Sequence, residues 1–221
     1  MRLLCISDIH GELHALRAVL ATAERRGHHK VLVAGDLCYP GPEPLETWRA
    51  LARVQAVCVQ GVTDKALGTL DPARLEAAAG DVEERRLARA FAETRKDVGE
   101  LVLERLRRLP TYHRMPLENG GELLLVHGSP EDPTEPFTHD MDDEEIAALI
   151  GDDPADVIVC GMSHIPFVRE VASTLVINVG SVGAAPGGEV AHATFLDIST
   201  EHGIQIEQIE VPLGDVEAVG T

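Results

Sequence analysis

Long apolar runs and paired cysteines are lacking in this chain of 221 residues, and each absence excludes a class of protein. No apolar run approaches the roughly 20 residues that a helix needs to cross a bilayer, so we expect no membrane-spanning segment. The N-terminus has no basic segment followed by an apolar core and a cleavage site, so we expect no signal peptide. The four cysteines lie singly, without a Cys-x-x-Cys pair, which excludes zinc-ribbon spacing. We therefore expect buried, reduced thiols in a cytoplasmic protein.

Basic residues are scarce in the second half of the chain. Residues 118–221 contain one, Arg169, against 21 Asp and Glu, whereas residues 1–117 contain 18 Lys and Arg against 16 Asp and Glu. The formal net charge of −18 therefore comes from the second half. A surface this acidic repels nucleic acid unless cations mediate the contact, so we do not expect a nucleic-acid partner. A need for solubility, or a salt-adapted host, is sufficient to explain the excess of acids.

Two enzyme classes are disfavoured because their motifs are missing. The sequence contains no Gly-x-Ser-x-Gly elbow of a serine hydrolase and no Gly-x-x-x-x-Gly-Lys loop of an NTP-binding protein. With 44% hydrophobic residues, the chain is long enough to bury a sizeable core. We expect residues 1–221 to form a single domain.

The spacing of apolar residues predicts an α/β first half and a β-rich second half. Helical spacing is evident in residues 12–26, whereas short apolar runs bounded by turn residues indicate buried strands. Because a strand–helix–strand unit joins parallel strands, we expect the first two strands to be parallel. Strands are predicted at 2–7, 30–34, 54–59, 112–118, 122–127, 157–160, 167–171, 175–179, 190–198 and 204–211, and helices at 12–26, 45–53, 142–150 and, as two helices broken near Gly80, within 72–109. This pattern favours two packed sheets with helices outside them.

The first predicted strand breaks into a loop at Asp8, two residues before His10. A carboxylate and an imidazole with this spacing at the end of a strand can converge on one metal ion. Alternatively, Asp8 caps a helix and His10 is a surface loop residue. These two residues alone do not decide between the two interpretations.

The same event recurs after other predicted strands. Asp36 follows the second strand and Asp64 the third, while His127 and His164 follow two later strands. Ligands of α/β sheets bind at the carboxyl ends of strands, and a buried Asp or His needs a partner, so we predict a metal site here. Oxygen and imidazole ligands suit a divalent ion such as manganese, iron, zinc or nickel. A shared carboxylate could bridge two ions, an arrangement used in the hydrolysis of phosphate esters.

The order of these motifs resembles that of the calcineurin-like metallophosphoesterases, above all their small bacterial and archaeal phosphodiesterase branch. The resemblance extends from residue 1 to about residue 198. Its motifs are Asp8-x-His10-Gly11, Gly35-Asp36, Gly61-x-x-Asp64, His127-Gly128, Gly161-x-Ser163-His164-x-Pro166 and Asn178-x-Gly180-Ser181-Val182-Gly183. The resemblance implies a four-layer α-β-β-α sandwich, in which two mixed sheets are flanked by helices.

The resemblance also implies roles for the candidate ligands. Asp8, His10, Asp36 and His164 would hold a first ion, with Asp36 bridging to a second ion that His127 helps to hold. Water activated by the ions would then attack phosphorus in line, while the ions neutralise the charge that develops on the phosphoryl oxygens.

The chain departs from the family pattern at the second ion. Gly61-Val62-Thr63-Asp64 stands where the family has Gly-Asn-His-Asp, and Gly161-Met162-Ser163-His164 stands where it has Gly-His-Thr-His. Val62 and Met162 thus replace two ligands, and Thr63 replaces a histidine that can protonate the leaving group. Valine cannot ligate, and a thioether is a poor ligand for hard ions. We therefore expect one strong site and a second that is weak or absent.

Three interpretations stay open. The protein works with one ion, or it recruits a replacement ligand such as His139, Asp140 or Asp64, or it no longer catalyses and binds a phosphorylated ligand or partner instead. The sequence favours a cytoplasmic metal-dependent phosphoesterase that acts on phosphodiesters or small nucleotides. Asp64 would serve the catalytic site by orienting the loop at 62–63 or a water.

Two further segments have open interpretations. Residues 178–183 could present backbone N–H groups to a phosphate, or could form a plain turn that closes the sheet. The helical segment at 72–109 is a possible face for a homo-oligomer, although its mixed charges leave no distinct apolar stripe.

Overall fold

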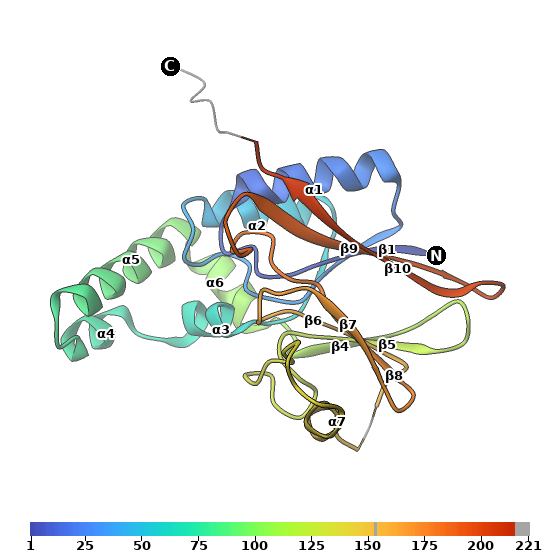
Figure 1. Ribbon diagram of the computed structural model, residues 1–221. Helices are drawn as coiled ribbons and strands as arrows, with labels where there is room; N and C mark the ends of the chain where they lie inside the picture. Colours follow the sequence, from blue (N-terminus) through green and yellow to red (C-terminus); the bar gives the residue numbers. More distant parts are fainter. Residues whose placement is uncertain (153, 215–221) are drawn as a thin grey trace.

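Two five-stranded β-sheets lie face to face, with helices on their outer sides (Figure 1). The computed structural model describes residues 1–152 and 154–214. In sheet order, the first sheet consists of β10 (Gly203–Pro212), β9 (Val190–Ser199), β1 (Arg2–Ile6), β2 (Lys30–Val33) and β3 (Val57–Cys58). The second consists of β4 (Tyr112–Pro116), β5 (Glu122–Val126), β6 (Val157–Cys160), β8 (Thr174–Asn178) and β7 (Phe167–Val171).

Both sheets are mixed. β1 pairs in parallel with β2, as predicted, and antiparallel with β9. In the second sheet, β6 pairs in parallel with both β5 and β8, while β4 and β7 are antiparallel edge strands. The predicted sandwich of two mixed sheets flanked by helices is therefore confirmed.

The helices fall into two groups. Six of them belong to the first sheet and its loops: α1 (Leu13–Arg26), α2 (Pro44–Arg53), α3 (Val62–Thr69), α4 (Pro72–Ala78), α5 (Val82–Val98) and α6 (Glu100–Arg107). The seventh, α7 (Asp143–Ile150), packs on the outer face of the second sheet. In Figure 1, α4 and the start of α5 extend away from the sheets. Among the described residues, no helix is both long and apolar enough to span a membrane.

Successive side chains of each strand point to opposite faces of the sheet, and this alternation forms the packed layers of the core. In β1, Leu4 and Ile6 pack with the residues of α1, whereas Leu3 and Cys5 pack against the second sheet. In β5, Leu123 and Leu125 join that same central layer, whereas Leu124 and Val126 pack toward α7. Since successive side chains of a strand point to opposite faces, strands buried on both faces must be apolar throughout.

The first half of the chain differs from the prediction in three places. Residues 62–69, for which no helix was predicted, form α3. The segment 72–109 contains three helices, because the chain breaks at Gly99 as well as near Gly80, and Gly99 has a φ of 78° that favours glycine. The strand predicted at 54–59 is reduced to two residues, Val57–Cys58.

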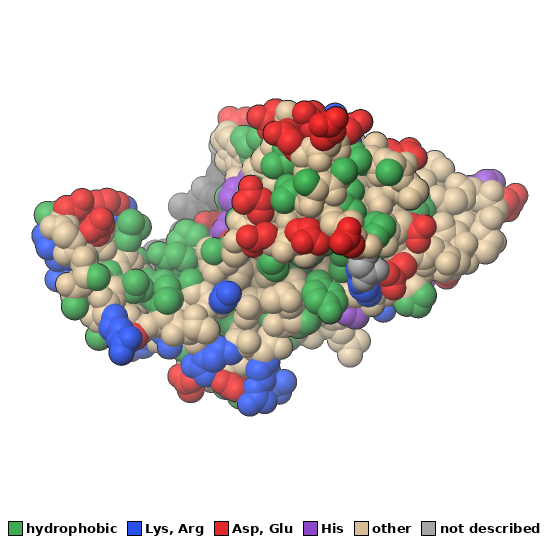
Figure 2. All heavy atoms as spheres, turned by 90° about the horizontal axis from the view of Figure 1, so that it is seen from below, with side chains coloured by type: hydrophobic (Ala, Val, Ile, Leu, Met, Phe, Trp, Pro, Cys, Tyr) green, Lys and Arg blue, Asp and Glu red, His purple; other side chains and the backbone are tan. Residues whose placement is uncertain are grey.

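The cysteines are in the free form that the sequence predicted, and the charged side chains are unevenly distributed over the surface (Figure 2). All four cysteines are free, and burial raises the pKa of Cys5 and Cys160 above that of an ordinary thiol. Seen from the side of α7, acidic side chains gather over one part of the surface and Lys and Arg side chains over another (Figure 2). In Figure 2, some acidic side chains also lie among the Lys and Arg side chains, in keeping with the 16 Asp and Glu of residues 1–117.

Candidate metal centre

Loops from both sheets bring five candidate ligands together. Asp8 and His10 follow β1, Asp36 follows β2, His127 follows β5 and His164 follows β6. Their ligand atoms form two groups, each within 4.8 Å: Asp8, His10 and His164 in one, and Asp8, Asp36 and His127 in the other. Asp8 is shared, and Asp36 lies with His127 rather than with His10 and His164. All five side chains that the sequence predicted as metal ligands thus meet at one place.

Two of the histidines are held in a form that can bind a metal. The Nδ1 of His10 lies 2.6 Å from the backbone carbonyl oxygen of Tyr39, and the Nδ1 of His127 lies 2.6 Å from that of Ala34. A carbonyl oxygen can only accept, so each Nδ1 carries the proton and each Nε2 presents a lone pair. A metal-binding histidine is ordinarily oriented in this way by the partner of its other nitrogen.

His127 provides an independent test of whether the site fits a metal. Its Nε2 is buried and has no hydrogen-bond partner among the described residues, although it lies 3.6 Å from Asp36 Oδ1. A buried polar atom without a partner is unfavourable by about 1–3 kcal/mol and is uncommon in folded proteins. A cation held between the nitrogen and the carboxylate would satisfy both, so the donor set fits a divalent ion.

Asp8 is fixed by the loop after β6. Its Oδ2 accepts a hydrogen bond from the Met162 amide at 2.9 Å, while its Oδ1 lies 3.2 Å from His164 Nε2. Burial raises the pKa of Asp8, but the hydrogen bond to His164 and the positive charge of the nearby histidines outweigh it, so that this pKa lies below its usual value. The same hydrogen bond raises the pKa of His164.

Asp64 holds the loop that carries Asp36. Its fully buried carboxylate accepts hydrogen bonds from the amides of Asp36, Leu37 and Gly61, at 2.9, 3.0 and 3.0 Å. Burial and the neighbouring Asp36 carboxylate raise the pKa of Asp64, whereas the amide hydrogen bonds lower it. The Asp64 carboxylate thus faces backbone amides and belongs to neither of the two ligand groups.

The backbone at this site lies in an unfavourable region. Among residues 1–152 and 154–214, seven non-glycine residues have a positive φ, and four of them are the candidate ligands Asp8, His10, Asp36 and His164, with φ between 52° and 60°. Such a conformation is uncommon for residues other than glycine, and is estimated to be unfavourable by roughly 1–3 kcal/mol for each residue. Its concentration at one place indicates that the surrounding structure holds these side chains for a purpose other than stability.

Two glycines permit the close approach of the loops. A Cβ on Gly61 would collide with Oδ1 of Asp36, and one on Gly161 would collide with Ser7 and Asp8. Any side chain at either position would therefore displace a candidate ligand. This explains the glycine that begins each of the motifs at 61–64 and 161–164.

Residues 178–183 connect the loops of the site to one another through hydrogen bonds. Nδ2 of Asn178 donates to the carbonyl oxygen of Gly161 at 2.7 Å, and the hydroxyl of Ser181 donates to that of Asp8 at 2.8 Å. The amides of Val182 and Gly183 donate to the loop after β1. Since these groups already have partners within the protein, the segment joins the loops of the site to one another and its amides do not face a ligand.

The suggested replacement ligands lie elsewhere. His139 and Asp140 are exposed, and Asp140 is bonded to Thr138. Neither belongs to a group of potential ligands among the described residues. Val62, at the start of α3, is 39% exposed, and Met162 contributes its backbone amide to Asp8.

A family model agrees with this geometry. The model of the calcineurin-like phosphoesterase superfamily domain matches residues 1–201. The chain belongs to this superfamily. Superfamily members are generally phosphoesterases that use divalent metal ions, and the five converging Asp and His residues are a donor set of that kind.

Similar proteins come from archaea and bacteria. An uncharacterized protein of Methanocaldococcus jannaschii is 29% identical over 179 residues, which cover 80% of this chain and 68% of that protein. A solved structure of a hypothetical protein from Pyrococcus horikoshii superposes with a TM-score of 0.77 at 23% identity, covering 96% of this chain and 88% of the other. A metallophosphoesterase from Sphaerobacter thermophilus gives 0.73 at 22% identity, with 96% and 89% covered. At these identities the two solved structures support the fold alone.

Proposed function

We propose that this calcineurin-like protein is a metal-dependent phosphoesterase that hydrolyses phosphodiesters or small nucleotides. The observation that carries the proposal is the buried, unpartnered Nε2 of His127 facing Asp36, beside the group of Asp8, His10 and His164. Hydrolysis adds the oxygen of water to phosphorus, breaks the ester P–O bond and releases the alcohol. A bound divalent ion would lower the pKa of water and neutralise charge on the phosphoryl oxygens.

The residues of the chain supply orientation. Asp8, His10 and His164 would hold the stronger ion, and Asp36 with His127 would hold a weaker one, because Val62 and Met162 leave that side short of ligands. The amide of Thr63 donates to Asp36 Oδ1 at 2.8 Å, and Asp64 fixes the amide of Asp36 itself. We assign Asp64 a positioning role, because its carboxylate acts on the backbone of the loop. Since no histidine stands at position 63, water would supply the proton for the leaving alcohol.

A non-catalytic phosphate-binding protein is the second candidate. It is favoured by Val62 and Met162, which reduce the ligands of the weaker ion. In this case the site would still bind one ion and a phosphoryl group, but turnover would be absent.

Metal content and turnover distinguish the two candidates. We expect metal-free protein to take up Mn²⁺ and then to hydrolyse bis(4-nitrophenyl) phosphate. Asp36→Asn should lower turnover by about 100-fold or more, since loss of a partner in the outer shell alone lowers metal affinity by about 10–100-fold. The matched control is Asp140→Asn, an exposed residue outside the site, which should behave as wild type.

Two results would contradict the enzyme. One is the absence of turnover on diesters, monoesters and nucleotides in folded, Mn²⁺-loaded protein, and the other is equal turnover in Asp36→Asn and wild type. A gain of activity in the combined variant Val62→Asn, Thr63→His and Met162→His would show that the weaker site limits the rate.

A further inference from the structure

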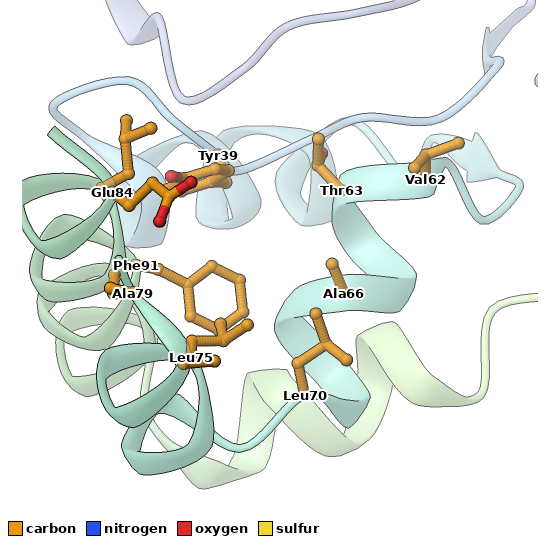
Figure 3. Close-up of a pocket in the computed structure, with 12 residues that line it drawn as sticks. Tyr39, Val62, Thr63, Ala66, Leu70, Leu75, Ala79, Glu84 and Phe91 are labelled. Carbon is orange, nitrogen blue, oxygen red and sulfur yellow. The ribbon is translucent and has the colours of Figure 1, made fainter. Parts of the chain in front are cut away.

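An apolar cavity of about 490 Å³ opens between α3, α4 and α5, next to the candidate metal centre. Figure 3 shows Val62, Thr63 and Ala66 of α3, and Leu70 directly after it, on one side of the cavity. Helices α4 and α5 form the other side, and Tyr39 lies along its upper part. A volume of this size is typical of sites for small organic molecules, which are about 300–1,000 Å³.

Two residues belong to both the cavity and the metal centre. The ring of Tyr39 lines the cavity and packs edge to face on Phe91, with 5.5 Å between the ring centroids. The backbone carbonyl oxygen of Tyr39 orients the candidate ligand His10. Thr63 also lines the cavity, and its amide holds Asp36. The wall of the cavity and the support of the metal ligands are therefore the same two segments of chain.

The residues that line the cavity are unfavourable for a charged group of a ligand. Among the described residues that line the cavity, the only charged one is Glu84, whose Oε2 accepts a hydrogen bond from the Gly80 amide at 2.6 Å. No Lys or Arg is present there to neutralise an anion. A phosphate in this cavity would meet apolar side chains and one carboxylate, both of which are unfavourable for it.

Large apolar side chains remain exposed around the cavity. Val62, Leu70 and Leu87 line it and are 39%, 44% and 48% exposed. Exposed apolar surface that is contiguous with a hollow is typical of a binding site rather than of ordinary surface. Burial of such surface by an apolar ligand is favourable by roughly 25 cal/mol per Å².

We propose that this cavity binds one uncharged, apolar arm of the phosphoester substrate, such as an aromatic ring system, while the phosphoryl group lies at the metal centre. The inference rests on the proposed function, since it requires a phosphoryl group at Asp8, Asp36 and the histidines. It goes further by naming the substrate class: esters of phosphate with an apolar alcohol, as opposed to polyphosphates or esters of charged alcohols.

The test compares two ligands that differ only by the apolar arm. Binding of 1-naphthyl phosphate and of inorganic phosphate to the full-length, Mn²⁺-loaded protein is measured by calorimetry, and the ratio of the two affinities is the readout. We expect naphthyl phosphate to bind at least about tenfold more tightly in the wild type. The ratio should fall toward one in Leu87→Gln, which makes the lining polar, and in Ala66→Trp, which fills the cavity.

The matched control is Leu101→Gln. Leu101 is an exposed leucine of α6 (76% exposed) that does not line the cavity, so this variant should keep the ratio of the wild type. Equal affinities for the two ligands in wild-type protein that binds phosphate and hydrolyses diesters would overturn the inference and leave the proposed function intact. Absence of both phosphate binding and hydrolysis would overturn the proposed function, and the inference with it.

A second copy of the chain is the competing occupant. Sedimentation of the wild type and of Leu87→Gln distinguishes it, because an apolar interface would be weakened by the polar side chain. A dimer that becomes a monomer in Leu87→Gln would overturn the inference, whereas the same sedimentation for both proteins supports it.

Discussion

The Nε2 atoms of His10 and His164 lie 3.2 Å apart, although 154 residues separate them in the sequence. His10 comes from the loop after β1 of the first sheet and His164 from the loop after β6 of the second. Because the Nδ1 of His10 is occupied by the carbonyl oxygen of Tyr39, its Nε2 presents a lone pair toward His164. The two sheets thus meet at a pair of imidazoles, and the stronger ion would connect them.

Metal binding should therefore stabilise the protein strongly. An ion that binds only the folded state adds about 2.7 kcal/mol to the free energy of unfolding at a concentration 100 times its dissociation constant. We expect Mn²⁺ to raise the melting temperature of wild type, and to have little effect on His164→Ala, which lacks one of three ligands in its group. Calorimetric melts with and without Mn²⁺ measure this. His202→Ala, at an exposed position in the turn between β9 and β10, is the control. Equal stabilisation of His164→Ala would contradict the assignment.

Replacement of Asp64 tests its positioning role. Asp64→Asn places an amide group among three N–H donors, so at least one of these hydrogen bonds is lost and buried donors remain unpaired. We expect the free energy of unfolding to fall by about 2–4 kcal/mol in urea titrations of the metal-free protein.

The control for Asp64 is Asp81→Asn. Asp81 is the exposed N-cap of α5, and its carboxylate accepts a hydrogen bond from the Glu84 amide. Asparagine caps helices about as well as aspartate. Its stability should change by less than about 0.5 kcal/mol. If Asp64→Asn and Asp81→Asn have similar free energies of unfolding, the negative charge of Asp64 is not required to hold the three amides.

A methyl group at Gly61 should damage the site through sterics alone. The added Cβ would collide with Oδ1 and the backbone nitrogen of Asp36, so Gly61→Ala should displace this carboxylate and weaken the binding of a second ion. Overpacking of this kind destabilises by about 1–3 kcal/mol. Mn²⁺ stoichiometry and urea unfolding are the measurements.

Gly80→Ala is the matched control for Gly61. Its new Cβ would meet only Glu84 Oε2, at an ordinary 3.4 Å, and its φ is not in the left-handed region. We expect a change within about 0.5 kcal/mol. If Gly61→Ala binds metal as the wild type does, the close approach at this position is not required for the site.

The strands and the convergence of the candidate ligands could be predicted from the sequence because both depend on local patterns. Short apolar runs that end in Asp or His determine where a chain leaves a sheet, and parallel strands collect such ends at one edge. The carboxyl ends of β1, β2, β5 and β6 follow this rule in the structure. The helix α3 was missed because it begins with the β-branched Val62 and Thr63 and contains Gly68, all of which are weak helix formers.

The remaining features depend on contacts that the sequence does not display. The positive φ of Asp8, His10 and Asp36 arises where loops from different strands lock together; Asp and His adopt it more often than most residues, but this preference alone does not locate it. The cavity was missed for a related reason. An apolar residue in or beside a helix, such as Leu87 in α5 or Leu70 after α3, is expected to face the core, and only the arrangement of the helices leaves these two exposed.

The hydrogen bonds of Asp64 have a consequence for how this protein can change. They hold the loop that carries Asp36 through its backbone amides, so the side chains at positions 62 and 63 are not needed to hold it. Those two positions line the cavity, so under the proposed substrate class new side chains there would alter which alcohols are accepted while Asp64 still holds the turn. Directed evolution that randomises 62 and 63 and leaves Asp64 untouched is therefore a direct route to new selectivity, and natural divergence could follow the same route.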